Sequence, residues 1–130
     1  MPRSNHSASH DFDVVARFLE HRASTERRDG AHIFYNDLAA KLDFPEVGEA
    51  WFAHPFCGIF GALDIEDVDA ERPLRTALVI SKKHMVPGDG FFKTLLRLRP
   101  KQKPPKDDIQ RIQLWSDELD RLLEYYQRKA

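Results

Sequence analysis

Apolar side chains recur every three to four residues in several stretches of the chain, and this spacing predicts helices. The first helix follows a capping residue, Ser9 or Asp11, and ends in the polar run 24–30. The others are expected over 36–42, over 55–72, over 91–98 and from 107 to near the end of the chain. The last is the clearest, because its apolar stripe is continuous and two acidic residues start it.

The stretch 74–81 has a different pattern. Its centre, 76–80, is short and rich in β-branched residues, which predicts a strand. The segment 32–35 is also strand-like, and we expect it to pair with 74–81 and form a small sheet beside the helices. Before the next helix, residues 86–89 place proline and glycine as a type II turn requires.

These elements predict an α+β fold that is mainly helical, with a winged-helix-like core, a small two- or three-stranded sheet and a long C-terminal helix packed over it. A helix–turn–helix followed by a strand is the skeleton of a winged helix. The length of 130 residues suits one domain. We expect a disordered tail over 1–9, which is small and polar, and a single domain over 10–130. Gly58 and Gly61 inside the third predicted helix indicate that another backbone passes close by.

Several segments carry a resemblance to known proteins. They are Tyr-Asn-Asp-Leu-Ala at 35–39, Arg-Pro-Leu-Arg-Thr-Ala-Leu-Val-Ile at 72–80, Val-Pro-Gly-Asp-Gly-Phe-Phe at 86–92, and Trp115 with Glu118 and Leu119. Together they resemble a family of small prokaryotic winged-helix-like proteins of uncharacterised function, and the first two are similar to the DNA-binding half of alkyltransferase-like proteins. The resemblance implies a fold and no activity. The chain lacks the reactive Pro-Cys-His-Arg core of the alkyltransferases, and Cys57 precedes the strand, so no catalytic residue is carried over.

The composition excludes some classes of protein. With 20 Lys and Arg against 21 Asp and Glu, the net charge of −1 rules out binding of nucleic acid or anionic membranes by bulk charge alone. The longest apolar run is far shorter than the ~20 residues of a membrane span. The chain has one cysteine, so it forms no internal disulfide, and residues 1–10 do not resemble a signal peptide. We therefore expect a cytoplasmic protein with no membrane partner.

The charge is unevenly distributed along the chain. Residues 43–71 hold eight acidic residues and no Lys or Arg, and residues 72–106 hold ten basic residues and a single acid, Asp89. We expect these two segments to form separate faces of one body, each able to bind a partner. The predicted acidic face is Asp64, Glu66, Asp67, Asp69 and Glu71. The predicted basic face, for a partner or for phosphates, is Lys82, Lys83, Lys93, Arg97, Arg99, Lys101, Lys103 and Lys106.

This layout favours a small, non-enzymatic binding or regulatory module that acts in the cell through a protein partner, since complementary charge sets association rate and specificity. The alternative is a winged-helix protein that binds nucleic acid through the basic region 82–106. Docking of the second helix of the helix–turn–helix into the major groove is disfavoured, because that helix is acidic and phosphates would repel it. Head-to-tail self-association into a homo-oligomer, a purely solvated role for the charges, and an enzyme of unknown class are further alternatives.

Candidate reactive residues are few. His54 and Cys57 are three residues apart, as two ligands on one helical turn can be, and His84 is a third candidate ligand. A zinc site needs three or four ligands, commonly with paired Cys and His spacings, which a single cysteine does not provide. Cys57 lies among apolar residues near the acidic segment, so we interpret it as a small buried core residue. We predict no catalytic residue, no metal and no cofactor.

Overall fold

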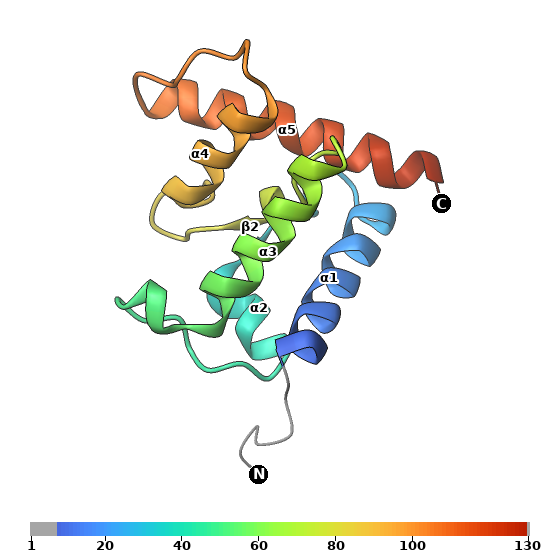
Figure 1. Cartoon of the computed structure of the whole chain (residues 1–130), viewed down its shortest axis with the longest axis vertical. Coiled ribbons are helices and arrows are strands. Elements are labelled where there is room, and N and C mark those ends of the chain that lie inside the picture. Colours follow the sequence, from blue (N-terminus) through green and yellow to red (C-terminus); the bar gives the residue numbers. More distant parts are fainter. Residues whose placement is uncertain (1–7, 130) are drawn as a thin grey trace.

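The computed structural model describes residues 8–129 and contains five α-helices, two short strands and two 3-10 helices, labelled η (Figure 1). In chain order the elements are α1 (Ala8–Thr25), β1 (Ile33–Phe34), α2 (Tyr35–Lys41), η1 (Trp51–Ala53), α3 (Pro55–Asp69), η2 (Arg75–Leu78), β2 (Val79–Ile80), α4 (Asp89–Leu98) and α5 (Asp108–Lys129). Most of the tail predicted over 1–9 lies outside the described residues. Ala8 and Ser9, however, belong to α1, so the predicted boundary is two residues too late.

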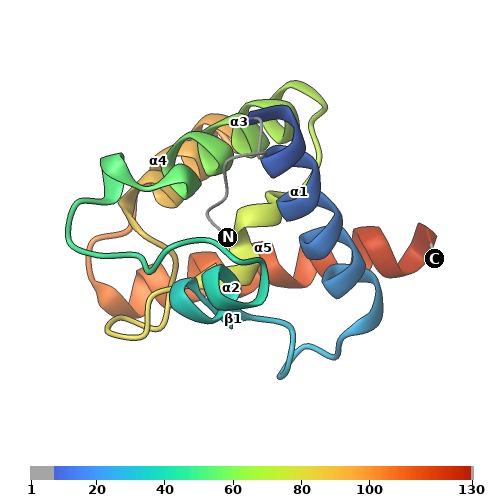
Figure 2. The same cartoon turned by 90° about the horizontal axis from the view of Figure 1, so that it is seen from below.

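The helices surround a central segment, 74–80, in which every residue is buried. Within this segment η2 contacts α1, α3 and α5, and α1 also packs against α3 and α5. Figures 1 and 2 show α4 and the connector that precedes α5 on the side of the molecule opposite α1. Each of α1, α3 and α5 directs side chains into the core. Leu19 of α1, Leu63 of α3 and Leu119 of α5 are fully buried examples. None of the helices between residues 8 and 129 has the length and hydrophobicity needed to cross a membrane.

The predicted strand over 76–80 is wrong for most of its length, because only its last two residues, β2, are extended. The residues before them form η2. Side chains from α3 and α5 form the hydrogen bonds to the η2 backbone that a neighbouring strand would form in a sheet. The Arg75 N–H donates to the Asp67 carboxylate at 2.9 Å, and the Trp115 indole N–H donates to the Ala77 carbonyl at 2.7 Å. Such partners satisfy the buried backbone without a sheet.

The two strands pair in parallel, with Ile33 opposite Val79 and Phe34 opposite Ile80. This confirms the predicted pairing of 32–35 with the second strand, and the sheet has two strands among the described residues. The fold is therefore α+β, mainly helical, with a small sheet and a long C-terminal helix, as the sequence predicts. The winged-helix-like character of the core stays a prediction.

The two helices that border the candidate site, α3 and α4, begin in different ways. As expected, α3 has Pro55 in its first turn, and the ring of His54 caps it by accepting a hydrogen bond from the Phe56 N–H at 3.0 Å. The predicted type II turn over 86–89 is wrong, because such a turn needs a positive φ at Gly88, and φ there is −69°. Gly88 is instead the residue that precedes and caps α4.

Candidate functional site

The predicted acidic face is not a single surface. Asp69 and Glu71 are exposed, and about half of the Glu66 side chain is exposed. Asp67 is fully buried, and Asp64 is partly buried in the wall of a cavity. Asp67 is inaccessible to a partner, so the prediction of a five-residue acidic face is wrong. The physical reason is that α3 distributes its four acidic residues, Asp64, Glu66, Asp67 and Asp69, around its circumference, and those on its inner side meet the core.

Asp67 is buried because Arg75, itself only 2% exposed, neutralises it. The Arg75 Nε lies 3.1 Å from Asp67 Oδ1, and the guanidinium also contacts Glu20 at 2.7 Å and Glu66 at 2.9 Å. Arg72 is a second partner of Asp67. Burial lowers the pKa of Arg75, but hydrogen bonds and ion pairs with the three carboxylates raise it above its ordinary value. The cluster joins α1, α3 and η2 and belongs to the structure of the core.

A second buried carboxylate removes one member from the predicted basic face. Glu118 of α5 is fully buried and accepts hydrogen bonds from the Leu74 N–H at 2.9 Å and from Arg99 Nε at 2.7 Å. Arg121 also contacts this carboxylate, at 3.2 Å. The assignment of Arg99 to a partner-binding face is therefore wrong. Its guanidinium turns inward because a buried carboxylate without a cation is costly.

The other cations of the predicted basic face are exposed: Lys82, Lys83, Lys93, Arg97, Lys101, Lys103 and Lys106. Within the part of the chain that the structure describes, none of them forms an ion pair with a carboxylate. They lie on the turn after β2, on α4 and on the connector 99–107. Figures 1 and 2 show these segments on the side of the molecule opposite α1. We call this side, together with the start of α5, the basic end.

The basic end also exposes aliphatic side chains. Ile109 is 79% exposed, Met85 47% and Ile112 46%. Lys83 and Ile112 border the same cleft, of about 880 Å³, between the turn after β2 and α5. Met85 is held at a φ of 59°, which is an uncommon conformation for a residue with a side chain. The basic end thus exposes both charged and apolar side chains.

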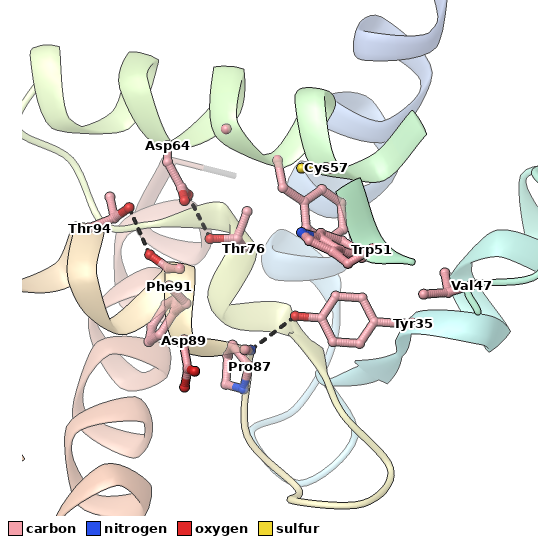
Figure 3. Close-up of a pocket in the computed structure, with 14 residues that line it drawn as sticks. Tyr35, Val47, Trp51, Cys57, Asp64, Thr76, Pro87, Asp89, Phe91 and Thr94 are labelled. Atoms are coloured by element: carbon pink, nitrogen blue, oxygen red, sulfur yellow. Dashed lines mark hydrogen bonds between the residues drawn. The ribbon is translucent and has the colours of Figure 1, made fainter. Parts of the chain in front are cut away.

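A cavity of about 610 Å³ lies between α2, η1, α3 and α4 (Figure 3). The rings of Tyr35, Trp51 and Phe60 form part of its wall, with centroids 5.4 to 5.9 Å apart. Gly61 also borders the cavity, and a Cβ added there would have nothing within 4 Å. A Cβ added at Gly58 would likewise have nothing within 4 Å, so the prediction that another backbone passes close to these two glycines is wrong.

Two polar side chains are fixed in the wall of this cavity. Asp64 Oδ1 accepts a hydrogen bond from the Thr76 hydroxyl at 2.7 Å, and the Tyr35 hydroxyl accepts one from the Gly88 N–H at 3.1 Å (Figure 3). Burial raises the pKa of Asp64 to about 6, although the hydrogen bond from Thr76 lowers it. Burial also raises the pKa of the Tyr35 hydroxyl. Each group keeps lone pairs or a hydrogen for a further hydrogen bond.

The candidate metal ligands have other roles or lie elsewhere. Both ring nitrogens of the buried His54 are hydrogen-bonded, one to the Phe56 N–H and the other to the Pro45 carbonyl at 2.7 Å. Cys57 is only partly buried and borders the cavity, which corrects its interpretation as a core residue. His84 is exposed on the turn after β2. Between residues 8 and 129, no three His, Cys, Asp or Glu side chains are placed to hold a metal ion.

The sequence did not identify the cavity, because its residues come from five separate elements and the loops between them and share no motif. One signal was available. Asp64 follows Phe60 by four residues, which places an acid on the same side of α3 as a buried aromatic side chain. An acid on an apolar stripe indicates either a buried partner or a polar group that faces a cavity.

No family model, curated protein or solved structure matches the chain. The assignment of function therefore rests on the geometry and chemistry of the basic end and of the cavity. The resemblance to small winged-helix-like proteins stays a prediction, and so does the expectation that the chain has no catalytic residue.

Proposed function

We propose that this protein is a non-enzymatic, cytoplasmic binding module that takes an acidic, amphipathic segment of a protein partner at its basic end. One observation carries the proposal: this end of the molecule exposes aliphatic side chains together with cations that have no carboxylate partner among the described residues. Lys83 and Ile112 border one cleft, and Ile109 lies one helical turn before Ile112 on α5. The matching ligand presents carboxylates next to apolar side chains.

The cations supply an attraction that acts before contact. Because Arg72, Arg75 and Arg99 are paired with acids, the exposed cations are the ones left to meet a ligand. A positive surface speeds association with an acidic partner and orients it. An exposed ion pair contributes only about 0.2–1 kcal/mol, so the apolar side chains must supply much of the affinity.

The exposed aliphatic side chains are suited to supply this affinity. Burial of apolar surface contributes about 25 cal/mol per Å², and Ile109 has most of its side chain still in water. Met85 is unbranched and adapts its shape to a partner. An exposed apolar group with a polar rim is typical of a protein interaction site.

Nucleic acid is the second candidate, and the same cations favour it. Two features weigh against it. The connector 99–107 has no aromatic side chain on which a base could stack. Ile109 and Ile112 gain nothing from contact with phosphates.

Affinity capture with the tagged full chain from a nuclease-treated cell extract tests the proposal. Lys82→Glu/Lys83→Glu reverses two cations of the basic end, and Ile109→Ser removes an exposed aliphatic side chain. The matched control, Arg17→Glu/Arg27→Glu, reverses two exposed cations elsewhere on the molecule. We expect a protein that the wild type and the control retain and that both basic-end variants lose.

Retention of the same protein by both basic-end variants contradicts the proposal. Titration with duplex DNA at two salt concentrations tests the second candidate function, binding of nucleic acid. Submicromolar binding with a steep salt dependence would favour nucleic acid over a protein partner. Capture of a second copy of the chain, with a matching dimer in sedimentation velocity, would favour self-association, with the exposed Asp69 and Glu71 as the acidic partner residues.

A further inference from the structure

We infer that the cavity between α2, η1, α3 and α4 binds a small organic cation, with the Asp64 carboxylate as its counter-ion and the rings of Tyr35, Trp51 and Phe60 in its wall. This inference goes beyond the proposed function and does not depend on it. The cavity differs from the basic end in the sign of its charge and in the kind of ligand that it selects.

Asp64 differs from the other two carboxylates that α3 and α5 direct into the molecule. Asp67 and Glu118 are each in contact with two arginines. Asp64 forms no ion pair with a Lys or Arg among the described residues. The Thr76 hydroxyl donates a hydrogen bond to it, and Arg75 acts on it only as a charge beyond ion-pair contact. A carboxylate held in a largely apolar wall without a cation is costly. A ligand that brings a positive charge removes that cost.

The lining of the cavity selects the sign of the ligand's charge. Two carboxylates, Asp64 and Asp89, border the cavity, and no Lys, Arg or His side chain of the part of the chain that the structure describes does so. Asp89 lies in the first turn of α4, where its charge offsets the partial positive charge of the helix N-terminus, and it also pairs with Arg111. An anionic ligand would therefore be repelled by Asp64, which has no ion pair, whereas a cationic ligand is attracted to it.

The aromatic side chains fit the same ligand. The face of an aromatic ring attracts an ammonium or guanidinium group that lies within about 6 Å of its centroid. The three ring centroids are 5.4 to 5.9 Å apart, so one small molecule can contact more than one ring. The volume of about 610 Å³ is typical of small-molecule sites. The ligand class is thus an amine or guanidine that carries an apolar body.

An NMR titration of the isotope-labelled full chain tests the inference, with phenethylammonium as the cation and phenethyl alcohol as its neutral analogue. At neutral pH the cation should shift the indole signal of Trp51 and the amide signals of Gly61, Gly88 and Thr94, which border the cavity. The alcohol should bind about 10- to 100-fold more weakly, because it lacks the charge-assisted hydrogen bond to Asp64.

Four variants locate the site. Asp64→Asn keeps the shape and an oxygen for the Thr76 hydroxyl, and it should weaken binding of phenethylammonium about 10- to 100-fold. Asp69→Asn, on the exposed side of α3, should bind as the wild type does. Gly61→Leu fills the cavity and should abolish binding of both probes. Gly58→Leu, the matched change on the same helix outside this cavity, should preserve it.

Three results would overturn the inference. The first is the absence of shifts with phenethylammonium in the millimolar range, or shifts confined to other parts of the molecule. The second is equal affinity of the wild type for the cation and for the alcohol. The third is a folded Asp64→Asn variant with wild-type affinity. The comparison of the two probes uses the wild type alone, so it decides the matter even where a variant does not fold.

Discussion

The guanidinium of Arg75 and the carboxylate of Asp67 lie in contact in the interior, where 2% of one side chain and none of the other is exposed. In the sequence the two residues stand on opposite sides of the boundary between the acidic segment 43–71 and the basic segment 72–106. Folding joins the segments at this boundary and neutralises part of each charge inside the molecule. The exposed cations of the basic end remain available to a ligand.

Replacement of Asp67 should destabilise the protein strongly. Asp67→Asn leaves Arg75 in the core without its one fully buried counter-ion among the described residues, and loss of one partner of a buried pair costs about 3–5 kcal/mol. Urea denaturation measures the change in the free energy of unfolding. Asp69→Asn, on the exposed side of the same helix, should change it by less than about 0.5 kcal/mol. Equal effects of the two substitutions would mean that the buried pair contributes nothing.

Glu118→Gln should also destabilise the protein, by about 3 kcal/mol, because Arg99 and Arg121 lose their shared carboxylate. Glu124 is the matched control on α5, since it is exposed and pairs with Arg128 one turn away. Glu124→Gln should cost no more than about 0.5 kcal/mol. Thermal or urea unfolding measures the loss of stability of the two variants. A similar loss for both would contradict the prediction that the buried Glu118 contributes more than the exposed Glu124.

Asp64 should make the protein less stable as the pH rises. Its pKa in the folded protein is about 6, above the ordinary value of 3.8, so the folded state holds this proton more tightly than the unfolded state. The stability contributed by the neutral carboxyl is therefore lost as the pH rises through 6, by about 2 kcal/mol between pH 4.5 and 7.5. Asp64→Asn removes the titration, so the variant should gain about this much relative to the wild type over that range. Urea denaturation at both pH values checks this, with Asp69→Asn as the control for loss of a carboxylate.

Gly58→Ala and Gly61→Ala should each stabilise the protein by about 0.5–1 kcal/mol, because alanine loses less backbone entropy than glycine in a helix. A Cβ at either position has nothing within 4 Å to meet. Thermal unfolding is the measurement. Destabilisation at either position would show that the open space beside these glycines is filled in solution.

The helices were predictable because the spacing of apolar residues within one segment, as in α5, indicates a helix without reference to distant residues. The strand over 76–80 was mispredicted because the hydrogen bonds that decide its conformation come from distant residues. The Ala77 carbonyl, for example, accepts a hydrogen bond from the indole of Trp115, 38 residues away. β-branched residues predict extended backbone only where a neighbouring strand supplies the partners.

The exposed lysines of the basic end were predictable from local polarity, but Arg99 was not, since only the fold brings it to Glu118. The cavity was beyond the reach of the sequence for the same reason. Asp64 stands out only once Thr76 and the ring of Trp51 are placed around the same space by other elements.

Zero-length cross-linking of the captured complex, followed by mass spectrometry, tests the central claim most directly, because a carbodiimide joins a lysine amine only to a carboxylate in contact with it. The account predicts cross-links from Lys82, Lys83 and Lys106 to acidic residues of the partner. Lys41 at the end of α2 is exposed and serves as the internal control. Cross-links from Lys41 in place of those three lysines would contradict the assignment of the basic end as the binding surface.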